Sequence, residues 1–74
     1  MAQMKVLSEV TGSVWKLLKK PGDRVAAGDE IMLIESMKME IPVLAEDDAT
    51  IAELHVAEAD AVQEGQLVAT LKAG

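Results

Sequence analysis

Lys38 is the residue whose setting is best suited to chemistry. It is the fourth residue of the hexapeptide Glu35-Ser36-Met37-Lys38-Met39-Glu40, and apolar runs occupy 31–34 before it and 41–44 after it. Two strand-like apolar runs joined by a short polar stretch are typical of a β-hairpin. A primary amine at the tip of a hairpin is accessible to other molecules. We therefore predict that Lys38 is a point at which a group is attached.

The neighbours of Lys38 are unusual for a loop tip, where polar residues are expected. Met37 and Met39 are apolar, and methionine is common on adaptable binding surfaces. We interpret both as recognition residues, with packing on the end of the domain as the alternative. Glu35, Ser36 and Glu40 flank the hairpin. They either face a partner or lie at solvated strand ends.

The rest of the chain offers no competing site. It has one histidine and no cysteine, which excludes disulfides and thiolate metal ligands. Adjacent residues of a strand point in opposite directions, so the acids of Glu46-Asp47-Asp48 do not converge on a cation and are interpreted as a solvated turn. The glycines are scattered and form no phosphate-binding loop. We expect no catalytic residue and no metal site.

Length and charge restrict the classes of partner. Seventy-four residues form one small domain, 1–74. The formal net charge of −6 disfavours nucleic acids and anionic membrane surfaces as partners. No apolar run approaches the roughly 20 residues of a membrane helix, and the N-terminus lacks the apolar core of a signal peptide. A monomeric domain in the cytoplasm is expected.

Closely spaced turn signals predict an all-β fold. One segment, Val56–Gln63, has an Ala-Glu-Ala content that favours a local helix. Strands are predicted at Gln3–Leu7, Gly12–Lys19, Arg24–Val25, Glu30–Glu35, Met39–Leu44, Thr50–Val56, Ala61–Val62 and Leu67–Leu71.

An internal repeat divides the chain into halves at approximately 1–37 and 38–74. Eight positions match in order at an offset of 37 residues. Such a repeat implies pseudo-two-fold symmetry in which neither half buries its apolar face alone. The matching pairs are Val6 and Val43, Val14 and Ile51, Leu17 and Leu54, Asp23 and Asp60, Val25 and Val62, Gly28 and Gly65, Ile31 and Val68, and Ile34 and Leu71.

The repeat makes two local predictions. Val14 and Leu17 are three residues apart, which breaks the period of two, so a bulge is predicted in this strand and in its copy. Ala59 stands where the first half has Gly22. If that position needs a positive φ, alanine is strained there. The turn Glu58-Ala59-Asp60 is therefore predicted to be the less regular one.

The chain resembles a known family, the biotinyl/lipoyl attachment domains. Glu35-Ser36-Met37-Lys38-Met39-Glu40 is similar to the biotin attachment motif, whose core is Met-Lys-Met after Ala or Ser. The resemblance covers nearly the whole chain and is greatest to small free-standing attachment proteins. Two departures are the turn residues 45–49 and Ala59. The other matching motifs are Gly12-x-Val14, Pro21-Gly22-Asp23-x-Val25-x-x-Gly28-Asp29 and Val62-x-x-Gly65-Gln66-Leu67.

The resemblance implies a fold and a function. The fold is a flattened β-barrel or sandwich of two antiparallel four-stranded sheets. Biotin protein ligase would join biotin to Lys38 through an amide. The biotin would then act as a swinging arm that carries a carboxyl group from a biotin carboxylase to a carboxyltransferase of an acyl-CoA type carboxylase. The domain itself would be a non-catalytic biotin carboxyl carrier.

Two other interpretations remain. A lipoyl carrier of a 2-oxoacid dehydrogenase complex would use the same fold and the same Lys38, with lipoate as the cofactor. Lipoyl motifs typically read Asp-Lys-Ala, so Met37 and Met39 disfavour this alternative. An unmodified adaptor module would keep the repeat but would need no lysine at the tip.

Overall fold

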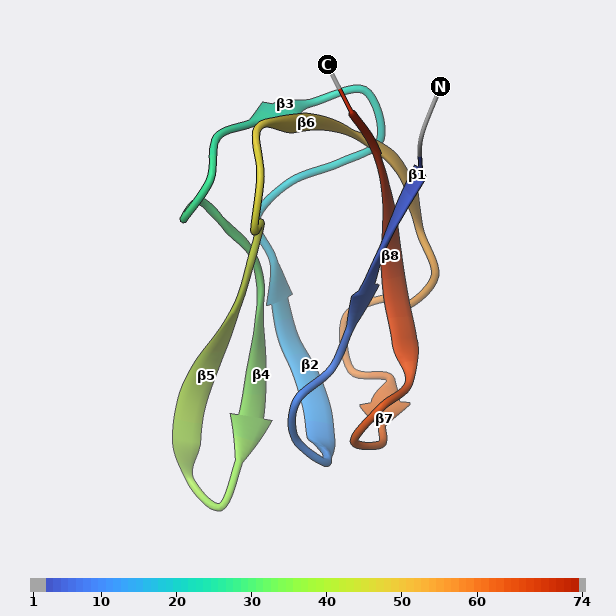
Figure 1. Ribbon diagram of the computed structural model, residues 1–74. Helices are drawn as coiled ribbons and strands as arrows, with labels where there is room; N and C mark the ends of the chain where they lie inside the picture. The colour runs from blue at the N-terminus through green and yellow to red at the C-terminus, as the bar shows by residue number, and fades with distance from the viewer. Residues whose placement is uncertain (1–2, 74) are drawn as a thin grey trace.

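The computed structural model describes residues 3–73, which form eight strands in two four-stranded antiparallel sheets (Figure 1). One sheet has the order β1-β8-β6-β3 and the other β5-β4-β2-β7. This arrangement confirms the predicted fold class. The strands are β1 (Gln3–Leu7), β2 (Gly12–Leu17), β3 (Arg24–Val25), β4 (Glu30–Ser36), β5 (Met39–Leu44), β6 (Ala49–Leu54), β7 (Ala61–Val62) and β8 (Leu67–Ala73).

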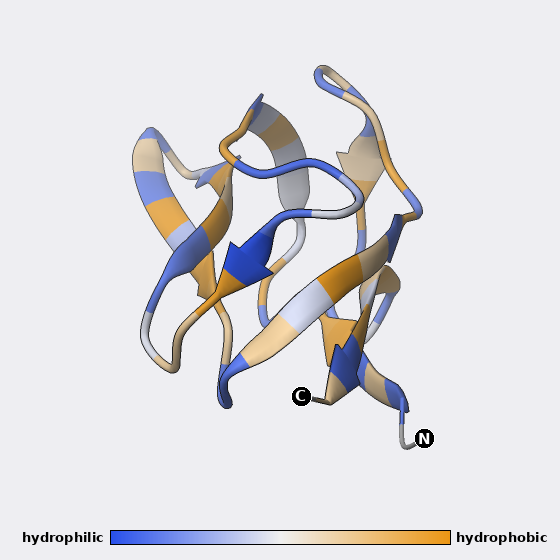
Figure 2. Ribbon diagram, turned by 90° about the horizontal axis from the view of Figure 1, so that it is seen from above, coloured by the Kyte–Doolittle hydropathy of each residue, from blue (hydrophilic) through white to orange (hydrophobic). Residues whose placement is uncertain are grey.

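The core lies between the two sheets and is aliphatic. Stretches of hydrophobic residues lie in the strands (Figure 2). Along β1, exposed and half-buried residues alternate, because successive side chains of a strand point to opposite faces. In the described residues, no helix is long and apolar enough to cross a membrane. The buried hydrophobic residues are Val14, Val25, Ile31, Met32, Ile34, Val43, Ala45, Ala49, Ile51, Val56, Val62, Val68, Ala69 and Leu71.

The strand pairing repeats at the offset of 37 residues. In β2 and β4, Val14 pairs with Ile34, and in β6 and β8, Ile51 pairs with Leu71. The hydrogen bonds repeat as well: the N–H of Val14 donates to Asp60 O and that of Ile51 to Asp23 O, both at 2.8 Å. The predicted pseudo-two-fold symmetry is therefore present down to single hydrogen bonds.

The predicted bulges are present at equivalent positions. The register shifts between Val14 and Lys16 in β2 and between Ile51 and Glu53 in β6. The extra residues, Trp15 and Ala52, therefore have no single partner on the neighbouring strand. The bulge in β2 turns the strand so that Val14 and Leu17 both contact the core. The bulge in β6 does the same for Ile51 and Leu54.

The prediction of a local helix at Val56–Gln63 is wrong. The segment instead forms a turn after β6 and then strand β7. In that turn the Asp60 carboxylate accepts the N–H of Ala57 at 2.8 Å. Val62 then pairs with Gly12 of β2 and is buried. Burial of Val62 and pairing with β2 therefore override the weak helical propensity of the segment.

The turn at Ala59 is as regular as its equivalent at Gly22, so the prediction of a less regular turn is wrong. Ala59 has a φ of 76° and Gly22 has a φ of 95°. Their N–H groups donate to equivalent acceptors, at 2.7 Å to Val14 O and 2.8 Å to Ile51 O. Ala59 keeps the turn by adopting a left-handed conformation, which costs an L-residue about 1–2 kcal/mol.

Replacing Ala59 with glycine should therefore stabilise the protein. We expect Ala59→Gly to raise the free energy of unfolding by about 0.5–1 kcal/mol, because the relief of strain exceeds the greater chain entropy of glycine in the unfolded state. Urea unfolding measures this change. The matched variant Gly22→Ala should lower the free energy of unfolding by a similar amount. A loss of stability in Ala59→Gly would contradict the assignment of strain.

Candidate functional site

Strands β4 and β5 form the hairpin that carries Lys38. The last cross-strand pair is Ser36 with Met39, which leaves Met37 and Lys38 as a two-residue loop. Their φ angles are 53° and 66°. Two positive φ values are the signature of a type I′ turn, which matches the twist of the strands and usually contains Asn-Gly. Two L-residues with side chains in this turn are strained, and such strain persists only where the surrounding structure enforces it.

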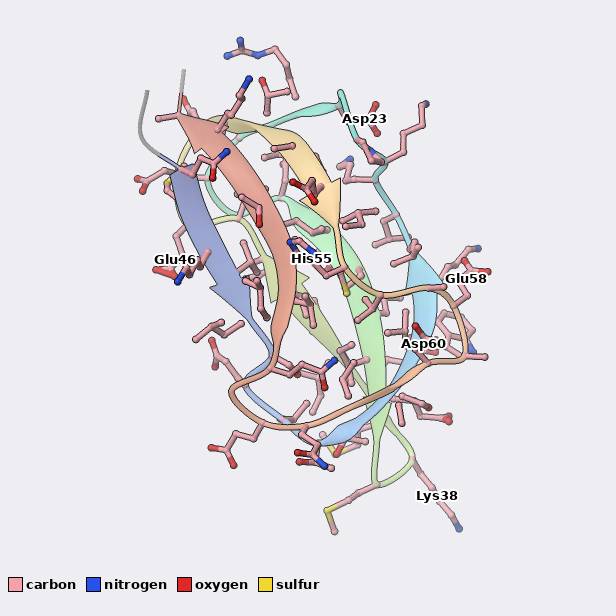
Figure 3. All side chains as sticks on the ribbon, turned by 90° about the vertical axis from the view of Figure 1, so that its right-hand side faces the viewer. Asp23, Lys38, Glu46, His55, Glu58 and Asp60 are labelled. Atoms are coloured by element: carbon pink, nitrogen blue, oxygen red, sulfur yellow. The ribbon has the colours of Figure 1, made fainter. Side chains whose placement is uncertain are left out.

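The Lys38 side chain extends from the end of the molecule into solvent (Figure 3). Met37 is 93% exposed and Met39 is 63% exposed. Among residues 3–73, no ion pair or side-chain hydrogen bond involves Lys38. The amine is thus presented without a partner, between two exposed thioether side chains.

The other predicted site residues form the neck of this hairpin. Glu35 lies directly opposite Glu40, and Ser36 lies directly opposite Met39. The Ser36 hydroxyl donates a hydrogen bond to the carbonyl oxygen of Thr11 at 2.8 Å. The structure therefore places all six residues of the hexapeptide in one hairpin, although only Ser36 makes a side-chain hydrogen bond to another loop.

Thr11 and Gly12 support the hairpin and were not among the predicted site residues. The Thr11 hydroxyl accepts the N–H of Glu64 at 3.0 Å, which joins the β1–β2 loop, the β7–β8 turn and the hairpin. Gly12 has no positive φ. A Cβ at this position would overlap the carbonyl oxygen of Glu35. Two sequence signals pointed to this glycine: its place in the motif Gly12-x-Val14 and its replacement by Ala49 in the repeat.

Two other polar residues that the sequence singled out make structural contacts. His55 follows β6, and its Nε2 lies 2.8 Å from the Thr70 hydroxyl. Asp48, interpreted as a solvated residue, accepts the N–H of Ala27 at 2.9 Å. Within the described part of the chain, no three His, Asp or Glu side chains gather to hold a metal ion.

A groove of about 450 Å³ lies between β1 and β5, and none of residues 35–40 lines it. Lys38 therefore lies on a protrusion and not in a cleft. The fold and the site together define a small all-β domain that presents one lysine at the tip of a hairpin.

Comparison with known proteins identifies this class more closely. The family described as "Biotin-requiring enzyme" matches residues 2–71. The biotin/lipoyl attachment protein of Bacillus subtilis is 38% identical over 68 residues, which cover 92% of this chain and 93% of that protein. A biotinylated protein TB7.3 homolog of Mycobacterium leprae is 39% identical over 66 residues, or 89% of this chain and 93% of that protein.

Solved structures share the fold. The urea carboxylase of Kluyveromyces lactis superposes with a TM-score of 0.91 and 35% identity, over 96% of this chain and 6% of that one. The lipoyl domain of the 2-oxoglutarate dehydrogenase complex from Azotobacter vinelandii gives a TM-score of 0.81 and 34% identity, over 96% and 98% of the two chains. The chain belongs to the family of biotin/lipoyl attachment domains.

The strained turn predicts the effect of a substitution at Met37. Asparagine tolerates a positive φ, so Met37→Asn should raise the free energy of unfolding by about 0.5–1 kcal/mol. The control Met39→Asn places the same residue in a strand, where asparagine is disfavoured, and should not stabilise the protein. Thermal unfolding of both variants measures the difference. Equal effects of the two changes would contradict strain at Met37.

The short distance between Gly12 and the carbonyl oxygen of Glu35 predicts that a larger residue at position 12 destabilises the protein. Gly12→Ala forces the backbone of β4 away from β2, and overpacking of this kind costs about 1–3 kcal/mol. We expect that loss of stability together with shifted amide resonances in the hairpin, measured by nuclear magnetic resonance. Ala49→Gly, at the equivalent position, should leave the hairpin resonances unchanged. Unshifted hairpin resonances in Gly12→Ala would show that Gly12 does not position the hairpin.

Proposed function

We propose that this protein is a biotin carboxyl carrier and that Lys38 bears the biotin. The observation that carries the proposal is the exposed, unpartnered Lys38 between Met37 and Met39 on a two-residue turn. Support also comes from relatives whose names describe attachment or biotinylation and which match along nearly their whole length.

The attachment reaction places simple demands on Lys38. A lysine amine must lose a proton before its nitrogen can act as a nucleophile, and the biotin protein ligase would accept that proton. The nitrogen would then form an amide bond to the carboxyl carbon of adenylated biotin, and the bond from that carbon to the phosphate oxygen would break, releasing AMP. No residue beside Lys38 is placed to act as a base for it within the described chain, so the ligase would supply the chemistry.

The hairpin determines where the attached group starts. Ser36, through its bond to Thr11, holds the neck of the hairpin against the neighbouring loop. The ordered neck limits the volume in which the end of the arm moves, and this raises its effective concentration at each partner site. When bound, biotin would supply the atom that carries the carboxyl group, and the protein itself would remain non-catalytic.

We further propose the partners of such a carrier. They are a biotin protein ligase, a biotin carboxylase and a carboxyltransferase, in the cytoplasm. The urea carboxylase whose structure resembles this chain contains a region of the same fold within a much longer chain. A separate carrier would instead meet its partners by diffusion, as a monomer.

A lipoyl carrier is the second candidate. The lipoyl domain from Azotobacter vinelandii has the same fold and a comparable identity, so a ligase that recognises the fold alone would accept this chain. Met37 and Met39 are the residues that favour biotin, because the lipoyl motif carries neither. The two candidates differ in the group found on the same amine.

Expression with a biotin protein ligase and excess biotin tests the proposal. We expect the intact mass to increase by one biotinyl group, the protein to bind streptavidin, and Lys38→Arg to show neither change. A parallel reaction with lipoate ligase should add little or no lipoyl group. The absence of a biotin adduct, or an adduct that persists in Lys38→Arg, would reject the proposal. A lipoyl adduct alone would favour the second candidate.

Truncating both methionines tests their role in recognition. The variant Met37→Ala with Met39→Ala should reduce kcat/KM for biotinylation about tenfold, which corresponds to about 1.4 kcal/mol of lost transition-state binding. Its stability should change little because both side chains are exposed. Leu44→Ala, at the far end of β5, is the control. An unchanged kcat/KM would show that the methionines do not contribute to recognition by the ligase.

A further inference from the structure

The groove between β1 and β5 lies where the two halves of the repeat meet. β1 and β5 are equivalent strands at the offset of 37 residues, and each is an edge strand of its sheet. The groove is lined by four pairs of equivalent residues, so it crosses the pseudo-two-fold axis and its two ends are structural copies of each other. The pairs are Val6 and Val43, Leu7 and Leu44, Ser8 and Ala45, and Glu9 and Glu46.

The two ends of the groove differ in polarity. The end beside the Lys38 hairpin is called the tip end, and its copy lines a smaller cavity of about 170 Å³. Asp47 occupies the position equivalent to Val10, and Lys5 occupies that equivalent to Pro42. The fold thus accommodates charged residues at both positions, and folding alone does not require the tip end to be apolar. The tip end is lined by Val10, Ile34, Ile41 and Pro42, and the copy by Asp47, Leu71, Met4 and Lys5.

The tip end is within reach of a group attached to Lys38. Ile41 follows Lys38 by three residues along the hairpin, which is about 10 Å at the usual rise of a strand. Val10 precedes Thr11, whose carbonyl oxygen accepts the Ser36 hydroxyl at the neck of the hairpin. About 11 bonds separate the Cα atom of a biotinylated lysine from the biotin ring, and they span about 14 Å when extended. The ring can therefore enter the groove.

The side chains of the tip end match the chemistry of the biotin ring system. Small-molecule sites are mostly apolar and contain a few polar groups that fix orientation. Ile34 is buried and Val10 and Ile41 are half-buried, and they present apolar surface to the fused rings and the thioether. Glu9 is exposed and also lines the groove. An ionised carboxylate accepts hydrogen bonds, so Glu9 can pair with the ureido N–H groups.

We propose that the tip end of the β1–β5 groove is an intramolecular binding site in which the biotinyl group on Lys38 rests between its visits to partner proteins. The proposal rests on the proposed function. Attachment makes the ring and the groove parts of one molecule, and a short flexible arm gives an effective concentration in the millimolar range. A site with a Kd of about 1 mM would then hold the ring for about half of the time. So weak a site covers the apolar ring without competing with tighter sites on partners.

The absence of cysteine from the chain allows biotin to be attached at one position without a ligase. The variant Lys38→Cys is alkylated with a biotin iodoacetamide whose linker matches the length of the lysine arm. The same variant alkylated with iodoacetamide alone is the control for an arm without a ring. Ala57→Cys, on the exposed turn that packs beside β2, carries the biotin reagent as the control for position. Circular dichroism and thermal unfolding establish that each protein is folded.

Nuclear magnetic resonance detects the ring in the groove. Biotin on Lys38→Cys should shift the amide resonances of Val10 and Ile41 and give nuclear Overhauser effects between the ring and their methyl groups. The arm without a ring and biotin on Ala57→Cys should do neither. The shifts should not depend on protein concentration, because the site and the ring belong to one molecule. Absent shifts, or shifts that appear only at high concentration and thus come from the arm of a second copy, would overturn the proposal.

The repeat supplies matched variants of the groove. Val10→Asp and Pro42→Lys, made separately in the biotin-bearing protein, install the residues of the other end. Each should reduce the biotin-dependent shift at Ile41 at least about threefold, because a charged residue replaces apolar surface. The control, Asp47→Ala with Lys5→Ala, alters the copy and should leave the shift unchanged. Pro42→Lys changes an exposed position and so tests the site even if Val10→Asp fails to fold. Equal effects of the variants and the control would reject the tip end as the site.

Capture by streptavidin gives a second readout and separates this proposal from the proposed function. If the ring rests in the groove for about half of the time, Pro42→Lys should raise the rate of capture about twofold, because only the free ring is captured. Biotin-dependent shifts in Lys38→Cys without ligase-catalysed biotinylation of the wild type would mean that the proposed function fails while the ring-binding site stands. Biotinylation of the wild type without such shifts would leave the proposed function intact and reject the resting site.

Discussion

The structure depends on the pairing of strands between the two halves of the repeat. Each sheet combines strands from both: β1 and β3 of the first half join β6 and β8 of the second, and β5 and β7 of the second join β2 and β4 of the first. Neither half can complete a sheet or cover its aliphatic side chains without the other. The hydrophobic core therefore forms only when the whole domain folds. The equivalent bulges let Val14 and Leu17 in one half, and Ile51 and Leu54 in the other, contact that core.

This pairing also explains why the Lys38 hairpin can be strained. The loop joins β4 to β5, which are held by six cross-strand pairs, and the neck is fixed to the β1–β2 loop through Ser36 and Gly12. Left-handed conformations at Met37 and Lys38 cost little compared with the loss of those contacts. Because the scaffold holds the turn, Met37 and Lys38 can occupy the two positions where Asn and Gly are usually preferred. Their identities can then be set by what binds them.

Much of the fold was predictable because it depends on spacing. The offset of 37 residues and the three-residue interval from Val14 to Leu17 predict the symmetry and the bulges, and both are geometric consequences of burying one face of a strand. The prediction of a helix at Val56–Gln63 was wrong because the helical propensity of the segment stabilises less than the pairing of β7 with β2. The roles of Thr11 and Gly12 depend on the distance between segments far apart in sequence, and no local pattern contains that distance. The Lys38 hairpin was predictable because the two apolar runs that form its strands lie close together in the sequence.

The repeat separates what folding requires from what it leaves free. Most inward positions are aliphatic in both halves, as with Val14 and Ile51 or Ile34 and Leu71, because substituting a polar residue there would bury an unpaired polar group. Outward positions have no such restriction, and there the halves have diverged: Glu35 pairs with Glu40, whereas the equivalent pair is Lys72 with Gln3. Stability of the core does not account for a divergence confined to the surface. Met37 and Met39, which are 93% and 63% exposed, belong to this unrestricted part of the chain.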